Sequence, residues 1–147
     1  MFTLLFLLYW LLSIASWAYA LRFGGKSAWW AFVLFVLAMA GTVISTDREH
    51  PQNLQTWSQI NVPLLITDSL YFLGLYVLAL RSRKYWTIWS AGLQLLCVIS
   101  HFGPLIDPVP RPKLYRGLEA FWMLPMLVTM VAGISLDRLH ERRPVGR

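Results

Sequence analysis

The sequence has few groups that carry chemistry: one cysteine, three histidines and only 14% charged residues in a chain of 147. A single cysteine excludes an intramolecular disulfide, a Cys-x-x-Cys redox pair and a cage of thiolates around a metal. Soluble domains usually contain about 25% charged residues, so this chain is poor in the side chains that keep a surface in water. The net charge of +6 accompanies 57% hydrophobic residues and a mean hydropathy of +0.54. This composition indicates a small membrane protein and not a nucleic-acid-binding one.

Long apolar stretches dominate the chain. About 20 helical residues are needed to cross a hydrocarbon core about 30 Å thick, because each residue advances a helix by about 1.5 Å. Stretches of that length, almost free of charge, lie at residues 2–21, 27–46, 60–80, 85–106 and 117–136, and a basic tail follows at 137–147. We therefore predict an all-α fold class and a single domain, an integral membrane bundle of five transmembrane helices in the lipid bilayer.

The basic residues predict the orientation of this bundle, because Lys and Arg are enriched in cytoplasmic loops. The loops after the first and third stretches and the C-terminal tail hold nine of the 13 Lys and Arg residues, and the opposite side holds four. We predict that the N-terminus lies outside and the C-terminus in the cytoplasm (N-out/C-in). Tryptophan collects at membrane interfaces. The predicted anchors at the cytoplasmic face are Trp29, Trp30, Trp86 and Trp89.

Three ionisable side chains lie inside the apolar stretches, namely Asp68, His101 and Glu119. All three belong to the outer leaflet in the predicted orientation. Ionisable groups within a span usually face the bundle interior or a water-filled cavity. Equal counting from the turn at 81–84 places Asp68 within about one helical turn of His101, with Gln94 one to two turns deeper. We predict that Asp68 and His101 face each other across the hairpin of the third and fourth helices.

Other polar side chains extend this pattern. Positions i, i+4, i+7 and i+11 share one face of a helix, and in the fourth stretch they are Ser90, Gln94, Cys97 and His101. The residues predicted to form a polar seam or ligand cavity are Asp68, Tyr71, Gln94, His101 and Glu119. Two interpretations are open. The seam either holds two helices together by mutual hydrogen bonds, or lines an outward-facing cavity between the third, fourth and fifth helices.

Catalytic and metal-binding motifs are missing from the sequence. It has no HExxH, no GxSxG and no glycine-rich phosphate loop. His101 is the only histidine within a span, which excludes a haem held by two histidines. The spacing of Asp47, Glu49, His50 and His101 matches no zinc-ligand pattern. We predict no catalytic residue, no metal site and no cofactor, and we do not expect an enzyme.

The segment from Asp68 to Pro108 resembles a group of short bacterial inner-membrane proteins. In that group an intramembrane Asp precedes an ALRS turn, followed by an aromatic core like YW…W-AG-x-Q-L and a His before a DP-containing loop. This chain has RSRKYWTIWSAGLQLLCVISH at 81–101 and LIDP at 105–108. The resemblance implies a multi-pass protein of the bacterial inner (plasma) membrane. It assigns no function, but it singles out Asp68, Trp86, Trp89, Gly92, Gln94, His101 and Asp107.

Two functions remain open at this point. The first is a small non-enzymatic membrane protein that serves as an accessory or assembly subunit of a larger envelope complex, with other membrane proteins as partners. The alternative is a small-ligand sensor similar to the tryptophan-rich sensory proteins, which share the chain length, the five helices and the richness in tryptophan. The PWW-x-PP loop of that family is absent here, since Trp29 and Trp30 lie between Ala28 and Ala31.

Overall fold

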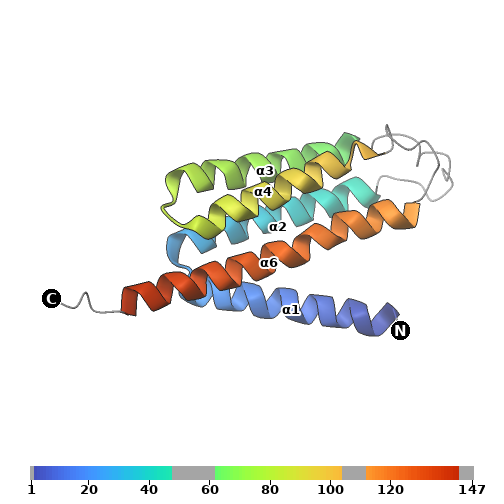
Figure 1. The fold of residues 1–147 in the computed structure, drawn as a ribbon. Coiled ribbons are helices and arrows are strands. Elements are labelled where there is room, and N and C mark those ends of the chain that lie inside the picture. Colours follow the sequence, from blue (N-terminus) through green and yellow to red (C-terminus); the bar gives the residue numbers. More distant parts are fainter. Residues whose placement is uncertain (1, 48–61, 104–111, 143–147) are drawn as a thin grey trace.

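The computed structural model describes the backbone of residues 2–47, 62–103 and 112–142, and the side chains of residues 7–45, 62–103 and 121–140. Within these residues the regular structure is entirely helical, with no strand. The helices are α1 (Phe2–Phe23), α2 (Gly25–Asp47), α3 (Val62–Arg81), α4 (Tyr85–Ser100) and α6 (Pro112–Arg142) (Figure 1). The predicted all-α fold is confirmed.

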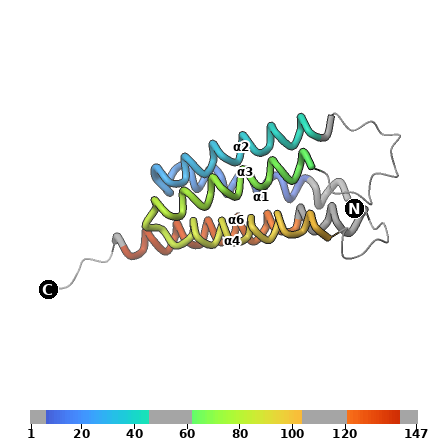
Figure 2. Tube along the Cα trace, turned by 90° about the horizontal axis from the view of Figure 1, so that it is seen from above, coloured from blue at the N-terminus to red at the C-terminus, as the bar shows by residue number. Residues whose placement is uncertain are grey.

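The helices run alternately up and down and form a closed ring. The principal packing pairs are α1 with α2, α2 with α3, α3 with α4, α4 with α6, and α6 with α1. The N-terminus lies at one end of the bundle and the C-terminus at the other, and both views show the helices roughly aligned with one long axis (Figures 1 and 2). In this ring each helix turns one face inward and leaves the opposite face outside.

Two short turns reverse the chain at the end of the bundle nearest the C-terminus (Figure 1). Between α1 and α2 lie Gly24 and Gly25, and Gly25 has a φ of 66°, a conformation that favours glycine. Between α3 and α4, the N–H of Lys84 donates to the hydroxyl of Ser82 (3.1 Å), and the Thr87 hydroxyl donates to the carbonyl of Lys84 (2.6 Å). The N–H of Thr87 also donates to the carbonyl of Lys84 (3.2 Å), so backbone and side-chain bonds together fix the start of α4.

The core of the ring combines large aromatic and methionine side chains with alanine, leucine and isoleucine. Its buried members are Trp17, Ala20, Ala28, Ala31, Tyr71, Leu75, Trp86, Ala91, Met126, Leu127, Met130 and Ile134. α4 and α6 approach each other closely at Gly133, where an added Cβ would lie only 2.3 Å from the Cβ of Trp86. Trp86 fits there because Gly133 has no side chain.

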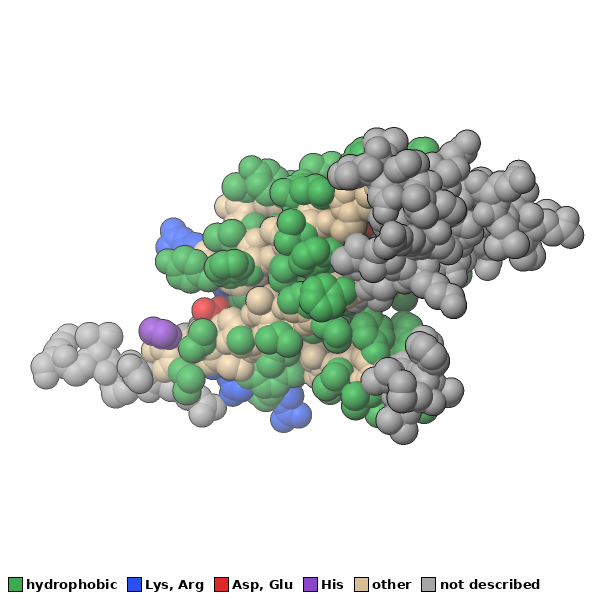
Figure 3. All heavy atoms as spheres, turned by 45° about the vertical axis from the view of Figure 1, so that its right-hand side comes forward, with side chains coloured by type: hydrophobic (Ala, Val, Ile, Leu, Met, Phe, Trp, Pro, Cys, Tyr) green, Lys and Arg blue, Asp and Glu red, His purple; other side chains and the backbone are tan. Residues whose placement is uncertain are grey.

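The outer faces of the helices are apolar. Segments long and apolar enough to cross a membrane are Gly25–Ser45, Val62–Arg81 and Phe121–His140, and the shorter apolar segments are Leu7–Phe23 and Tyr85–Ser100. More than half of each of these outward side chains is exposed: Leu11, Leu37, Leu70, Ile88 and Val128. Hydrophobic side chains also cover much of the face drawn in Figure 3. Polar groups inside and apolar groups outside are the arrangement expected of a small membrane protein.

Two helix boundaries differ from the predicted ones. α4 ends at Ser100 and not at residue 106, and the N–H of His101 bonds to the carbonyl of Val98 in a tighter turn (3.2 Å). Pro104 follows in the sequence and has no N–H to bond the carbonyl of Ser100 four residues earlier, which explains the end of α4 there. α6 begins at Pro112 instead of 117 and extends to residue 142 instead of 136. Proline is favoured at the first position of a helix, which explains the early start.

The predicted tryptophan anchors divide into two groups. Trp29, Trp30 and Trp89 point outward, with 60%, 62% and 66% of their surface exposed. Their role as interfacial anchors stays a prediction. Trp86 is 2% exposed, so its prediction as an anchor is wrong. Its side chain turns inward because the absence of a side chain at Gly133 leaves room for the indole against α6.

Candidate functional site

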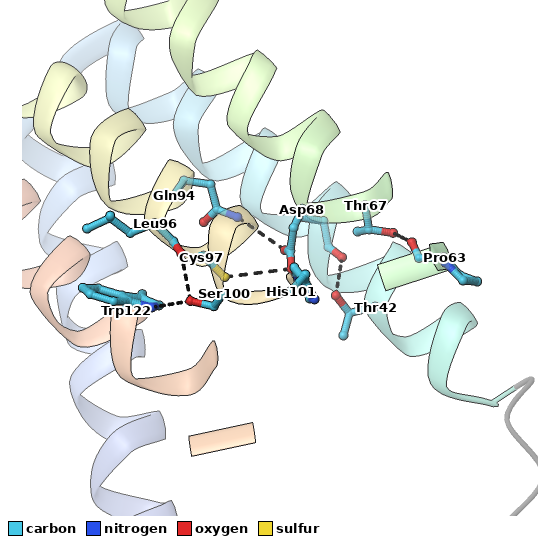
Figure 4. A network of polar contacts seen from close by, with 11 residues as sticks. Thr42, Pro63, Thr67, Asp68, Gln94, Leu96, Cys97, Ser100, His101 and Trp122 are labelled. Atoms are coloured by element: carbon cyan, nitrogen blue, oxygen red, sulfur yellow. Dashed lines mark hydrogen bonds and ion pairs between the residues drawn. The ribbon is translucent and has the colours of Figure 1, made fainter. Parts of the chain in front are cut away.

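Asp68, in the second turn of α3, is the centre of a cluster of polar side chains from α4. Its Oδ2 lies 2.6 Å from Nε2 of His101, and its Oδ1 accepts a hydrogen bond from Nε2 of Gln94 (3.4 Å). The thiol of Cys97 approaches Oδ2 at 3.9 Å. Figure 4 shows the three α4 side chains converging on this one carboxylate. The predicted contact between Asp68 and His101 is therefore present, with Gln94 on the same seam.

Helix geometry explains why these residues meet. Gln94, Cys97 and His101 are spaced three and four residues apart, so their side chains leave α4 on the same face. α3 and α4 are antiparallel neighbours joined by a short turn, and Asp68 faces them from the opposite helix. The tighter turn at the end of α4 keeps His101 on this face as the last residue before the chain leaves the helix.

The cluster is shielded from the surroundings of the bundle. His101, Gln94 and Cys97 are 5%, 6% and 7% exposed, and the side chain of Asp68 is 16% exposed. Taking such groups out of water costs free energy unless they are hydrogen-bonded. In this cluster each α4 side chain offers a donor or an exchangeable proton to the carboxylate, so their mutual contacts offset that cost.

A small cavity of about 110 Å³ adjoins the cluster. Its lining comes from α2, α3, α4 and α6 and consists of Phe35, Ala38, Met39, Thr42, Asp68, Tyr71, Gln94, Cys97, Trp122, Met123 and Met126. Water occupies about 30 Å³ per molecule in the liquid, so the space suits a few waters, an ion or a small molecule. The hydroxyl of Thr42 on α2, which also lines the cavity, donates to the carbonyl of Ala38 (3.0 Å).

The other predicted seam residues are placed as follows. Tyr71 is buried and lines the same cavity as Asp68. The backbone of Glu119 belongs to α6, but its side chain lies outside the described residues, and so does Asp107. Cys97 had no predicted role, although its position four residues before His101 places both on one face of α4. Thr42 and the cavity methionines come from other helices, and no spacing in the sequence connects them with Asp68.

A larger cavity of about 600 Å³ lies between α2 and α3 and has a different character. Its walls are mostly apolar, and Lys26 and Arg81 provide its charged groups. It contains no carboxylate, histidine or cysteine among its lining residues. Among the described residues, a carboxylate, a thiol and an imidazole come together at Asp68, Cys97 and His101.

Comparison of the chain with protein-family models, with curated proteins and with solved structures finds no match. A carboxylate, an imidazole and a thiol that meet beside a cavity can bind a polar or charged ligand, exchange protons with it, or coordinate a metal.

Proposed function

We propose that this protein is a non-enzymatic, five-span protein of the bacterial inner membrane, N-out/C-in, that binds a small ligand in the cavity beside Asp68. Three apolar helices of spanning length support the membrane location. The positive-inside distribution of Lys and Arg supports the orientation. The resemblance of residues 68–108 to short bacterial inner-membrane proteins supports the compartment.

The observation that carries the binding function is the cavity itself. Hydrogen bonds that merely hold α3 to α4 need close packing and no empty volume. Here about 110 Å³ remain directly beside Asp68, Gln94 and Cys97. Most of the lining is apolar, but the carboxylate, amide, thiol and hydroxyl groups of Asp68, Gln94, Cys97 and Thr42 border the same space. Because polar groups are costly to bury, their presence beside an empty volume favours a polar occupant over simple packing.

The position of the cluster suggests the side from which the ligand arrives. Asp68 is the seventh residue of α3, and His101 directly follows the last residue of α4. Both positions lie near the end of the bundle that also holds the N-terminus (Figure 1). In the N-out orientation the ligand reaches the cluster from outside, as in the sensor-like alternative considered from the sequence.

Thermal stability tests this function, because a ligand that binds only the folded protein raises its unfolding temperature. We expect the protein purified in mild detergent to lose stability on exhaustive dialysis and to regain it when the concentrated dialysate is returned. The unfolding temperature of Asp68→Asn should change neither on dialysis nor on return of the dialysate. Ser90→Ala is the matched control, because Ser90 is buried on α4 but donates to the carbonyl of Trp86 (2.9 Å) and does not line the cavity.

The same purification separates the second function. An accessory or assembly subunit of an envelope complex should elute with a partner protein in a fixed ratio. A stoichiometric partner together with a dialysis-insensitive unfolding temperature would favour that function over ligand binding. A chain that elutes alone and loses stability on dialysis favours the ligand-binding protein.

A further inference from the structure

We infer that Asp68, Cys97 and His101 form a binding site for a divalent transition-metal ion of the zinc class. This inference rests on the proposed function and names the chemical class of its ligand. One ligand atom from each residue, a carboxylate oxygen, a thiol sulfur and an imidazole nitrogen, lies within 4.8 Å of the other two. Thiolate, imidazole and carboxylate are the donors that zinc takes in proteins.

The two ligands from α4 have a spacing that suits a metal. His101 follows Cys97 by four positions, so the two side chains project one above the other from the same face of α4. Asp68 completes the set from α3, with its Oδ2 2.6 Å from the His101 nitrogen and 3.9 Å from the Cys97 sulfur. The metal would therefore connect two helices that already pack together.

The hydrogen-bonding pattern leaves the required atoms directed toward one another. Gln94 donates to Oδ1 of Asp68, while Oδ2 faces His101 and Cys97. A side chain that orients a ligating carboxylate in this way is a common second layer of metal sites. Gln94 is thus a positioning residue that keeps Oδ2 turned toward the metal.

Binding replaces protons with the metal. The Cys97 thiol must lose its proton, and Nε2 of His101 must carry none, so that one thiolate, one carboxylate and one neutral imidazole surround a 2+ ion. The sum of these charges is zero. A neutral centre is the form that a low-dielectric interior tolerates best.

Coordination requires a small local movement. Two ligands about 2.0–2.1 Å from a tetrahedral zinc lie about 3.3 Å apart, so Oδ2 of Asp68 and Nε2 of His101 must separate from 2.6 Å. The adjoining cavity of about 110 Å³ provides the space. It also leaves a fourth coordination position for water or a small ligand, as in zinc sites with three protein ligands.

Cobalt(II) is a spectroscopic probe for this site. The full-length chain, purified through a tag without histidine, is titrated with Co²⁺ in mild detergent. We expect one Co²⁺ per chain, a thiolate-to-cobalt charge-transfer band, tetrahedral d–d bands, and loss of these bands on adding Zn²⁺. Because Cys97 is the only cysteine in the sequence, a thiolate band reports on this site alone.

Variants assign the ligands. Cys97→Ser should abolish the charge-transfer band, and Asp68→Asn and His101→Gln should each weaken Co²⁺ binding by at least about tenfold, the lower end of what loss of even an outer-shell partner causes. His140→Ala is the control, since His140 is exposed at the far end of α6 and should leave the titration unchanged. Circular dichroism checks that each variant is helical.

The wild-type protein alone decides the inference, whatever the folding of the variants. A folded wild-type chain that shows no thiolate band at saturating Co²⁺ overturns the metal site. If that chain still loses stability on dialysis in an Asp68-dependent way, the cavity binds a different ligand, and the proposed function stands without the metal. If the wild-type chain shows neither the thiolate band nor an Asp68-dependent loss of stability on dialysis, both the metal site and the ligand-binding function are wrong.

Discussion

The carboxylate of Asp68 and the imidazole of His101 lie 2.6 Å apart across the interface of α3 and α4, with the imidazole side chain 3% exposed. This contact joins two helices that are separated in sequence only by a short turn. It also places a proton-exchanging pair at the edge of the cavity that Cys97 and Tyr71 line.

The Asp68–His101 pair should be energetically coupled. Removing one partner of a buried pair leaves the other uncompensated, at a cost of about 3 to 5 kcal/mol. We therefore expect Asp68→Ala and His101→Ala each to lower the free energy of unfolding by about 3 kcal/mol. The double variant should lose clearly less than the sum, because no unpaired group remains. Reversible unfolding by SDS in mixed micelles measures all four proteins. Strictly additive losses would show that the contact contributes nothing.

Gly133→Ala should destabilise the bundle. Its Cβ would lie 2.3 Å from the Cβ of Trp86 and 3.4 Å from the Cα, so α4 or α6 must move. Overpacking of this kind costs about 1 to 3 kcal/mol. Gly92→Ala on α4 is the control, because a Cβ there meets no atom within 4 Å, and alanine favours a helix over glycine by about 1 kcal/mol. Equal unfolding midpoints for the two variants would contradict the close approach of Gly133 and Trp86.

The ion pair between Lys84 and Asp137 should contribute little. Its atoms lie 3.3 Å apart, and the two side chains are 30% and 29% exposed. Partly solvated pairs of this kind contribute about 0 to 1 kcal/mol. We expect Lys84→Ala to change the free energy of unfolding by less than about 1 kcal/mol. The charge-exchanged double variant K84D/D137K should unfold with the free energy of the wild-type protein. A loss above about 2 kcal/mol would indicate that this contact holds the turn between α3 and α4 against α6.

The orientation can be tested with reporters that work on one side of the membrane only. A green fluorescent protein fused after Arg147 should fluoresce, and alkaline phosphatase at the same position should be inactive, because the C-terminus is predicted to be cytoplasmic. Alkaline phosphatase inserted after His50 should be active, since the loop between α2 and α3 is predicted to lie outside. An active phosphatase at the C-terminus would reverse the orientation and place the Asp68 cluster in the inner leaflet.

Periodicity and charge in the sequence were sufficient to predict the helices and the Asp68–His101 contact. Helical stretches of spanning length are visible as runs of apolar residues, and a short turn between two helices sets their register within about one turn. The end of α4 was predicted six residues too late, because the apolar run continues past Pro104, which lacks the N–H that a continuing helix would need. The end of α4 is therefore determined by the backbone at this position and not by the length of the apolar run.

The cavity could not be predicted from the sequence. It depends on how α2 and α6 pack against the α3–α4 pair, and no spacing in the chain connects Thr42 or Met123 with Asp68. The burial of Trp86 was missed for the same reason. It depends on Gly133, which lies 47 positions later in the chain and faces Trp86 from α6. The metal-ligating potential of Cys97 was visible only as an i, i+4 relationship with His101. Its third partner lies on another helix.

Native mass spectrometry of the full-length protein, released from mild detergent, tests ligand binding at Asp68 most directly. We expect the wild-type chain to carry an additional non-protein mass in a one-to-one ratio, the Ser90→Ala variant to carry the same mass, and Asp68→Asn to show only the mass of the polypeptide. A wild-type chain that is detected solely as the bare polypeptide, with a dialysis-insensitive unfolding temperature, would contradict the ligand-binding function and leave the Asp68–His101 contact as a structural link between α3 and α4.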